Sequence, residues 1–127
     1  IIELHGGGEA VKSYIHIRDV SLGEKSIMEN GKIGETYHLS PDSGVKVKDV
    51  VNSICCMLKH DPTSSTRNVE ERLGQDFAYV IDSTKARKEL GWKPEIGIEQ
   101  GIFEVCDWVE KQWNLIKKQP LEYVHKV

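Results

Sequence analysis

The chain has 127 residues, of which 39% are hydrophobic, and its 17 Lys and Arg against 20 Asp and Glu give a net charge of −3. These values are ordinary for a soluble globular protein, and the length suits one domain or part of one. The small negative charge gives no reason to expect nucleic acid or an anionic membrane as a partner, and no apolar run resembles a transmembrane helix or a signal peptide.

The chain opens on an extended segment, residues 2–5, with no initiating Met before it. A start inside a strand predicts a fragment or a trimmed chain. Gly6 to Gly8 predict a hairpin turn into a second strand over 11–17. The glycine run lacks the Lys-Ser/Thr of a P-loop, and it does not open a helix as a dinucleotide-binding loop does.

The middle and end of the chain read as alternating helices and extended segments. Asp19 is expected to cap a helix over about 20–30, and apolar stripes at 3.6-residue spacing predict helices over about 47–59 and 98–117. The stripe of the last helix is Ile98, Ile102, Val105, Val109 and Trp113. The shorter predicted elements are a strand over 35–40, a turn over 41–44, a loop over 61–65, and extended segments around 69 and over 79–81.

A short, tightly punctuated helix follows Asp82. Either Asp82 or Ser83 can accept the free N–H groups of its first turn, and Gly91 suits the left-handed residue that ends a helix. Ala86 and Leu90 are the expected buried pair, and Trp92 is expected to pack back on the core. The basic side chains are expected to form a solvated face: Lys85, Arg87 and Lys88.

The element order is β-β-α-β-α-β-α-α, which predicts an α/β fold with too few strands for a doubly wound sheet. The cysteines Cys55, Cys56 and Cys106 lack metal-ligand spacing, so we expect reduced, mostly buried thiols in a cytoplasmic protein. The five histidines are scattered, and no pair shares a helix face at ligand spacing, so we predict no metal site.

Arg72 and Lys12 are the charged residues with the strongest functional case. Each lies at a strand-to-loop position among apolar neighbours. Arg is suited to a bidentate hold on phosphate, and Lys supplies a point charge for the same task. The alternative is that both are plain surface charges or partners of Glu70, Glu71 or Asp76.

Five segments, in order, match motifs of one enzyme family. Residues 4–19 resemble "I-Y-G-x-G-x-x-x-R-D-W-x-x-V-x-D", and residues 34–39 resemble "G-E-x-Y-N-I". Residues 46–58 fit the helix that follows, and residues 72–76 resemble "R-P-G-x-D". Residues 82–94 resemble "D-x-x-K-x-x-x-x-L-G-W-x-P" nearly letter for letter. Together they resemble the C-terminal portion of extended short-chain dehydrogenases acting on nucleotide sugars, above all the dTDP-glucose 4,6-dehydratases and related NAD-dependent epimerase/dehydratases.

The resemblance implies a partial extended short-chain dehydrogenase fold that lacks the N-terminal Rossmann sheet. Residues 1–119 would be the substrate-binding C-terminal domain, and 120–127 a loose tail. Arg72, Lys12 and Gln75 would bind a nucleoside-diphosphate sugar. NAD and the catalytic Tyr-x-x-x-Lys pair would belong to the other half of the enzyme, so we expect no catalytic residue and no cofactor in this chain.

The chain departs from the family pattern at the site itself. The hairpin arginine is replaced by Lys12, a polar Asn at the start of the following helix by Val47, and the Asn of the "Y-N-I" strand by His38. Gln75 stands where a His beside Arg72 is common. These replacements leave the exact substrate open.

Three functions follow as hypotheses. The first is the substrate-binding part of a nucleotide-sugar dehydratase or epimerase, catalytically incomplete alone, whose parent reaction is NAD-dependent 4,6-dehydration. The second is a free-standing remnant that acts as an oligomerisation or interaction module without nucleotide binding. The third is a split enzyme whose partner chain supplies the Rossmann half. Apolar faces left uncovered by that half favour a homo-oligomer.

Overall fold

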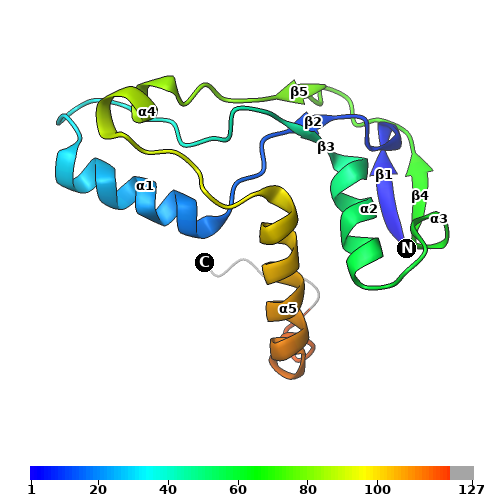
Figure 1. The fold of residues 1–127 in the computed structure, drawn as a ribbon. Coiled ribbons are helices and arrows are strands. Elements are labelled where there is room, and N and C mark those ends of the chain that lie inside the picture. Colours follow the sequence, from blue (N-terminus) through cyan, green and yellow to red (C-terminus); the bar gives the residue numbers. More distant parts are fainter. Residues whose placement is uncertain (121–127) are drawn as a thin grey trace.

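A computed structural model describes residues 1–120 as a mixed α/β fold, drawn in Figure 1. The elements are β1 (Ile2–His5), η1 (Gly6–Gly8), β2 (Val11–Lys12), α1 (Ile17–Asn30), β3 (Val45–Lys46), α2 (Val47–Met57), α3 (Pro62–Ser65), β4 (Thr66–Val69), β5 (Ala78–Tyr79), α4 (Thr84–Leu90) and α5 (Ile98–Ile116). The predicted tail falls almost wholly on residues 121–127, which lie outside the described residues.

The strands form two small sheets. β1 pairs with β4 in parallel, starting at Ile2 opposite Thr66. β2 lies between β3, which runs antiparallel to it, and β5, which runs parallel. The predicted hairpin between β1 and β2 is therefore wrong, and β2 is shorter than the predicted strand over 11–17.

The glycine turn explains why β1 and β2 separate. Gly6, Gly7 and Gly8 all have positive φ angles, of 55°, 66° and 69°. Three left-handed residues in succession turn the chain away from a hairpin path, and only glycine adopts this backbone without strain. A Cβ on Gly8 would lie 2.9 Å from the Cβ of Lys48, so the turn packs directly against the start of α2.

Helix α1 begins two residues before the predicted cap. The Nδ1 atom of His16 accepts the N–H of Arg18 at 3.2 Å, so His16 is the N-cap and Asp19 lies in the first turn. Asp19 is buried, and its carboxylate accepts the backbone N–H of Ile96 at 3.0 Å. Asp19 was expected to hold its own helix, and it instead holds the segment that leads into α5.

The α1–α4 contact forms one half of the core. Trp92 is buried, and its indole Nε1 donates to the backbone oxygen of Asp19 at 2.9 Å. Gly23 permits the close approach, since a Cβ there would lie 2.9 Å from that Nε1 atom. Ala86 is fully buried, and Gly91 ends α4 with a φ of 63°. The predicted positions of Ala86, Gly91 and Trp92 are confirmed.

The predicted basic face of α4 is only partly solvated. Asp82, rather than Ser83, accepts the N–H of Thr84, while the Ser83 hydroxyl donates to the backbone oxygen of Ser40 at 2.8 Å. The Arg87 guanidinium donates to the same Ser40 oxygen and to the Ser83 Oγ, and it forms an ion pair with Asp42 at 2.9 Å. Arg87 thus ties α4 to the 40–42 segment.

Two short predicted elements differ from the structure. Residues 35–40 form no strand, because side chains rather than a ladder hold them: Lys85 bonds Glu35 at 2.6 Å and lies 4.5 Å from the centre of the Tyr37 ring. Residues 62–65 form the short helix α3 instead of a loop, with Asp61 accepting the N–H of Thr63.

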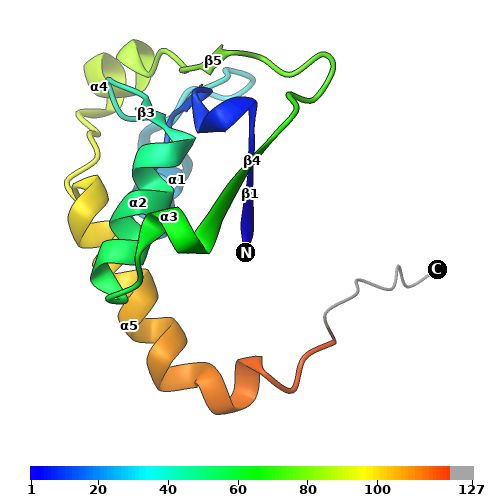
Figure 2. The same ribbon diagram turned by 90° about the vertical axis from the view of Figure 1, so that its right-hand side faces the viewer.

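Helices α2 and α5 pack against each other, as their apolar stripes predict, but the stripe of α5 is only partly covered. Trp113 and Val105 each remain 54% exposed. Figures 1 and 2 show the C-terminal half of α5 extending beyond the other elements. Within residues 1–120, no helix is both long enough and apolar enough to cross a membrane.

Candidate functional site

The fold brings Lys12 to the loop that carries Arg72 and Gln75. β2 and β5 run side by side, with Val11 donating to the Phe77 oxygen at 2.8 Å and Ser13 to the Tyr79 oxygen at 3.1 Å. At this junction the Lys12 ammonium donates to the backbone oxygen of Asp76 at 3.0 Å and lies 5.9 Å from the centre of the Tyr79 ring. Lys12 and the loop that carries Arg72 thus lie next to each other, although Lys12 and Arg72 are sixty residues apart in the sequence.

The loop itself is a turn fixed at both ends. Gln75 donates its N–H to the Arg72 oxygen at 3.2 Å, and Gly74 has a φ of 77°. At the start of the loop, the Glu71 carboxylate lies over Gly6 and accepts the N–H of Arg72 at 2.9 Å. The backbone is tied to the end of β1 just before Arg72, where the Nδ1 atom of His5 lies 3.1 Å from the Glu70 carbonyl oxygen, and to β2 at its other end.

The side chains of this loop are open to solvent. Arg72 and Gln75 are both exposed, and within residues 1–120 the Arg72 guanidinium has no hydrogen-bond or ion-pair partner. The alternative was that Arg72 and Lys12 pair with the side chains of Glu70, Glu71 or Asp76. Among residues 1–120, Lys12 bonds the Asp76 carbonyl rather than its carboxylate, and only the backbone N–H of Arg72 bonds Glu71. An arginine fork and a lysine at one edge can hold a diphosphate.

A second set of charges lies beside this edge and was not predicted. The Glu9 carboxylate pairs with Lys46 at 2.8 Å and with Lys48, at the start of α2. The hydrogen bond from Lys46, followed by that from Lys48, lowers the pKa of Glu9 to about 2. Val47 begins α2 as predicted and donates its N–H to the Ala10 oxygen. Residues so far apart in sequence give no local signal of such a cluster.

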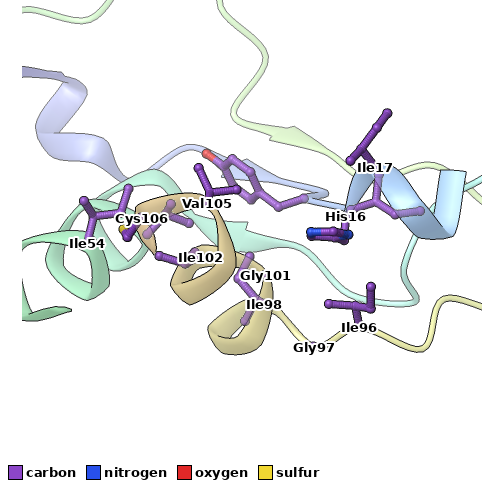
Figure 3. A pocket seen from close by; sticks show the side chains of 13 residues that line it. His16, Ile17, Ile54, Ile96, Gly97, Ile98, Gly101, Ile102, Val105 and Cys106 are labelled. Carbon is purple, nitrogen blue, oxygen red and sulfur yellow. The ribbon is translucent and has the colours of Figure 1, made fainter. Parts of the chain in front are cut away.

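An apolar pocket of about 340 Å³ lies where the end of β2, α2 and α5 meet, as Figure 3 shows. Isoleucines dominate its lining, together with Tyr14, His16 and Gly101. Because Nδ1 of His16 accepts the Arg18 N–H, the neutral ring carries its proton on Nε2, which faces the Glu104 carboxylate at 3.5 Å. The hydrogen bond from Gln100, followed by the charge of Arg18, lowers the pKa of Glu104. The sequence did not predict this pocket.

The glycine turn does not fit the pyrophosphate of a dinucleotide. It leads into β2 rather than into a helix N-terminus, and side chains of Glu71 and Lys48 already occupy the space above Gly6 and Gly8. Residues 1–120 contain no group of three potential metal ligands. Of the cysteines, Cys55 is buried, but Cys56 is exposed, contrary to the expectation of mostly buried thiols.

Comparison with known proteins gives one consistent family. The family model described as GDP-mannose 4,6 dehydratase matches residues 1–124. The dTDP-glucose 4,6-dehydratase of Xanthomonas campestris is 32% identical over 115 residues, which cover 84% of this chain and 33% of that protein. The fold is also similar to that of the dTDP-glucose 4,6-dehydratase of Streptomyces venezuelae, with a TM-score of 0.82 and 26% identity over 89% of this chain and 35% of that one.

A further solved structure, the UDP-glucose 4-epimerase of Bifidobacterium longum in complex with NAD⁺ and UDP, is 25% identical with a TM-score of 0.75. That comparison covers 88% of this chain and 35% of the epimerase. The chain thus spans about a third of the length of these relatives.

Proposed function

This chain belongs to the GDP-mannose 4,6 dehydratase family, and from that premise we propose that residues 1–119 are the nucleotide-sugar-binding, C-terminal part of a dTDP-glucose 4,6-dehydratase-like enzyme. The order of the five motifs supports the C-terminal assignment. The parent reaction is NAD-dependent 4,6-dehydration of a nucleoside-diphosphate hexose. In this proposal NAD and the hydride-transfer residues belong to the rest of the enzyme, because the glycine turn does not suit a dinucleotide.

The convergence of Lys12 and the Arg72 loop is the observation that carries this proposal. The Lys12 ammonium has three donors and uses one on the Asp76 oxygen, which leaves two for a ligand. The Arg72 guanidinium presents its fork to solvent from a turn whose backbone is tied to β1 before Arg72 and to β2 after it. An anchored backbone lowers the cost of ordering the loop when a diphosphate binds.

Each side chain has a distinct role in the proposed complex. Arg72 grips two phosphate oxygens at once, and Lys12 neutralises the same diphosphate as a point charge. Gln75, three residues after Arg72 on the same turn, offers an amide that donates and accepts to the ribose or the base. Val47 at the start of α2 cannot bond a sugar hydroxyl, so the sugar is held less tightly than the diphosphate.

Titration of the purified chain with dTDP and with UDP tests the proposal. We expect micromolar to millimolar affinity, and Arg72→Ala weakens it about tenfold or more, because a charge-assisted bond contributes roughly 1.5–3 kcal/mol. Arg67→Ala is the matched control: Arg67 is an exposed arginine on the neighbouring β4, but it already pairs with Glu3. Absence of binding to both nucleotides by calorimetry and ligand-observed NMR, or equal losses in the two variants, would overturn the proposal.

A second function, an oligomerisation or interaction module, is favoured by α5. Three large apolar side chains of its C-terminal half, Trp108, Trp113 and Leu115, remain more than half exposed. Surfaces of this kind mark sites where another molecule binds. Self-association and nucleotide binding use different residues, so the two functions are compatible and separately testable.

A further inference from the structure

Large apolar side chains lie close to the proposed diphosphate ligands and remain open to solvent. Leu73, Phe77 and Tyr79 are 104%, 69% and 54% exposed. All three belong to the segment from Arg72 to the end of β5, and Figure 2 shows that the part between β4 and β5 projects from the rest of the fold. Single exposed apolar residues are common on protein surfaces, but a group of them beside a candidate binding site indicates contact with a ligand.

Of the two aromatic rings in this segment, Phe77 is the more available. The Tyr79 ring is partly engaged, because Tyr79 lies opposite Lys12 in the β2–β5 ladder and the Lys12 ammonium is 5.9 Å from the ring centre. Phe77 precedes β5, and its backbone oxygen accepts the Val11 N–H at 2.8 Å. The Phe77 ring is therefore presented to solvent from a backbone that β2 holds in place.

Phe77 lies next to the charges that a diphosphate requires. Asp76 directly precedes Phe77, and its backbone oxygen accepts a hydrogen bond from the Lys12 ammonium at 3.0 Å. Arg72 belongs to the same loop, five residues before Phe77. A ligand held by Lys12 and Arg72 therefore has an aromatic surface within reach of the part that adjoins its phosphates.

The acidic side chains of the same loop narrow the class of ligand. Glu70, Glu71 and Asp76 are all exposed, and their charges repel an extended polyanion such as nucleic acid or an anionic membrane surface. A compact ligand avoids this repulsion when its negative charge is confined to one group and its remainder is uncharged. A nucleoside diphosphate meets both conditions, since its base is a flat ring that carries no charge at neutral pH.

We propose that Phe77 binds the base of the nucleotide by stacking, while Arg72 and Lys12 hold the diphosphate. This inference rests on the proposed nucleotide binding, and it adds a contact for a part of the ligand that the two cations do not hold. The contact is apolar and face to face, so it differs in kind from the hydrogen bonds of the Gln75 amide. Because every base has a flat π-face, Phe77 contributes to affinity without choosing between thymine and uracil.

Two probes separate the base from the phosphates: dTDP carries both, and inorganic pyrophosphate carries only the phosphates. By calorimetry, Phe77→Ala weakens dTDP binding about tenfold, because one base–aromatic stack is lost, and it leaves pyrophosphate binding unchanged. Arg72→Ala weakens the binding of both probes. Since dTDP contains no hexose, a loss of dTDP affinity in Phe77→Ala does not come from a contact with the sugar of a nucleotide-sugar substrate.

Phe77→Trp and Leu73→Ala are the matched variants. Phe77→Trp replaces one flat ring by a larger one, so it binds dTDP at least as tightly as the wild type. Leu73→Ala removes a fully exposed apolar side chain from the same loop and keeps the wild-type affinity. Equal losses of dTDP affinity in Leu73→Ala and Phe77→Ala, or a loss of pyrophosphate affinity in Phe77→Ala, would mean that the loop as a whole is disturbed and would overturn the stacking contact. Circular dichroism checks that each variant is folded.

NMR of the ligand observes the stack directly. A ring C–H proton of thymine or uracil lies in the plane of the base, so stacking on Phe77 moves its resonance upfield when the nucleotide binds the wild type. Phe77→Ala abolishes most of this shift at equal saturation with ligand. The same upfield shift in Phe77→Ala and in the wild type would contradict the proposed contact.

The outcomes also separate this contact from nucleotide binding itself. If neither dTDP nor UDP binds the wild type, the proposed function is overturned, and this inference is overturned with it. If both nucleotides bind in a way that depends on Arg72, and Phe77→Ala binds them as tightly as the wild type does, only the stacking contact is overturned.

Discussion

The two ends of the molecule differ in whether their polar side chains are buried and paired or exposed to solvent. At the α1–α4 end, Asp19, Ser40 and Ser83 are buried, and among the described residues no buried side-chain nitrogen or oxygen lacks a partner. At the other end, the loop of residues 70–77 is exposed throughout, and its Arg72 fork faces solvent. Satisfied polar groups specify and stabilise a fold, whereas an exposed cation on an anchored backbone is available to a ligand.

This contrast separates the family marker from the proposed chemistry. The best-matched motif, residues 82–94, supplies Ser83, Arg87 and Trp92 to the interior, where they hold α4 and the 40–42 segment in place. The proposed ligand contacts come from the weaker motif around Arg72. The similarity of a segment to its family therefore reports here on packing more than on binding.

Removal of the Trp92 side chain is expected to give the largest effect, and it tests whether stability depends on the α1–α4 end rather than on the exposed loop. Trp92→Ala empties the α1–α4 core and leaves the Asp19 oxygen without its donor, so we expect the free energy of unfolding in urea to fall by about 3–5 kcal/mol. Leu73→Ala, in the exposed loop, is expected to change it by less than about 0.5 kcal/mol. Comparable losses in both variants would mean that the loop is also part of the structural core.

Two glycines with similar φ angles sharpen the contrast. Gly8→Ala meets Lys48 in addition to the strain of a left-handed residue, so we expect a loss of about 2–3 kcal/mol. Gly74→Ala has a φ of 77° but nothing within 4 Å of its new Cβ, so only the backbone strain of about 1 kcal/mol applies. Thermal unfolding of the two variants measures the difference, and equal melting temperatures would contradict the close packing of η1 on α2.

The smallest expected effect concerns the acid dependence of stability. Bonds from Lys46 and Lys48 hold the pKa of Glu9 at about 2, below its usual 4.5. A carboxyl whose pKa is lowered by folding stabilises the fold above its unfolded pKa, and this contribution is lost as the pH falls from about 4.5 towards 2. Urea titrations at successive pH values should therefore give a flatter acid dependence for Glu9→Gln than for the wild type.

Glu24→Gln on α1 serves as the control for that measurement, because Glu24 forms no ion pair with any residue from 1 to 120. An NMR titration reads the Glu9 carboxyl directly. A midpoint near the ordinary glutamate value would contradict the pair of lysine bonds.

Elements defined by neighbouring residues could be predicted from the sequence. The apolar stripes indicated α2 and α5, and Asp82, Gly91 and Trp92 gave the limits and packing of α4, because caps and periodicity act over a few residues. The predicted hairpin was wrong because strand pairing is a long-range choice, which three left-handed glycines redirected. The strand over 35–40 failed for a similar reason, since Lys85 and Glu89 from α4 hold that segment in place of a ladder.

The residues of the candidate site were predicted from the sequence, but their arrangement in space was not. Arg72, Lys12 and Gln75 were chosen by charge and resemblance, and only the β2–β5 pairing brings Lys12 to the loop. The pocket beside α5 and the triad of Glu9, Lys46 and Lys48 depend on contacts across three elements, for which no spacing rule exists. The binding roles of Arg72, Lys12 and Gln75 are predictions that nucleotide titration tests.

The parallel pairing of β1 with β4 has a consequence for how the molecule folds. Ile2 lies opposite Thr66, so 64 residues must be synthesised before β1 finds its partner. At roughly 5–20 residues per second, several seconds separate the synthesis of β1 from that of β4. Because such non-local contacts slow folding, the ladder should form late, after the local helices. A strand without its partner exposes unpaired backbone groups, so β1 depends on the late arrival of β4 to cover that edge.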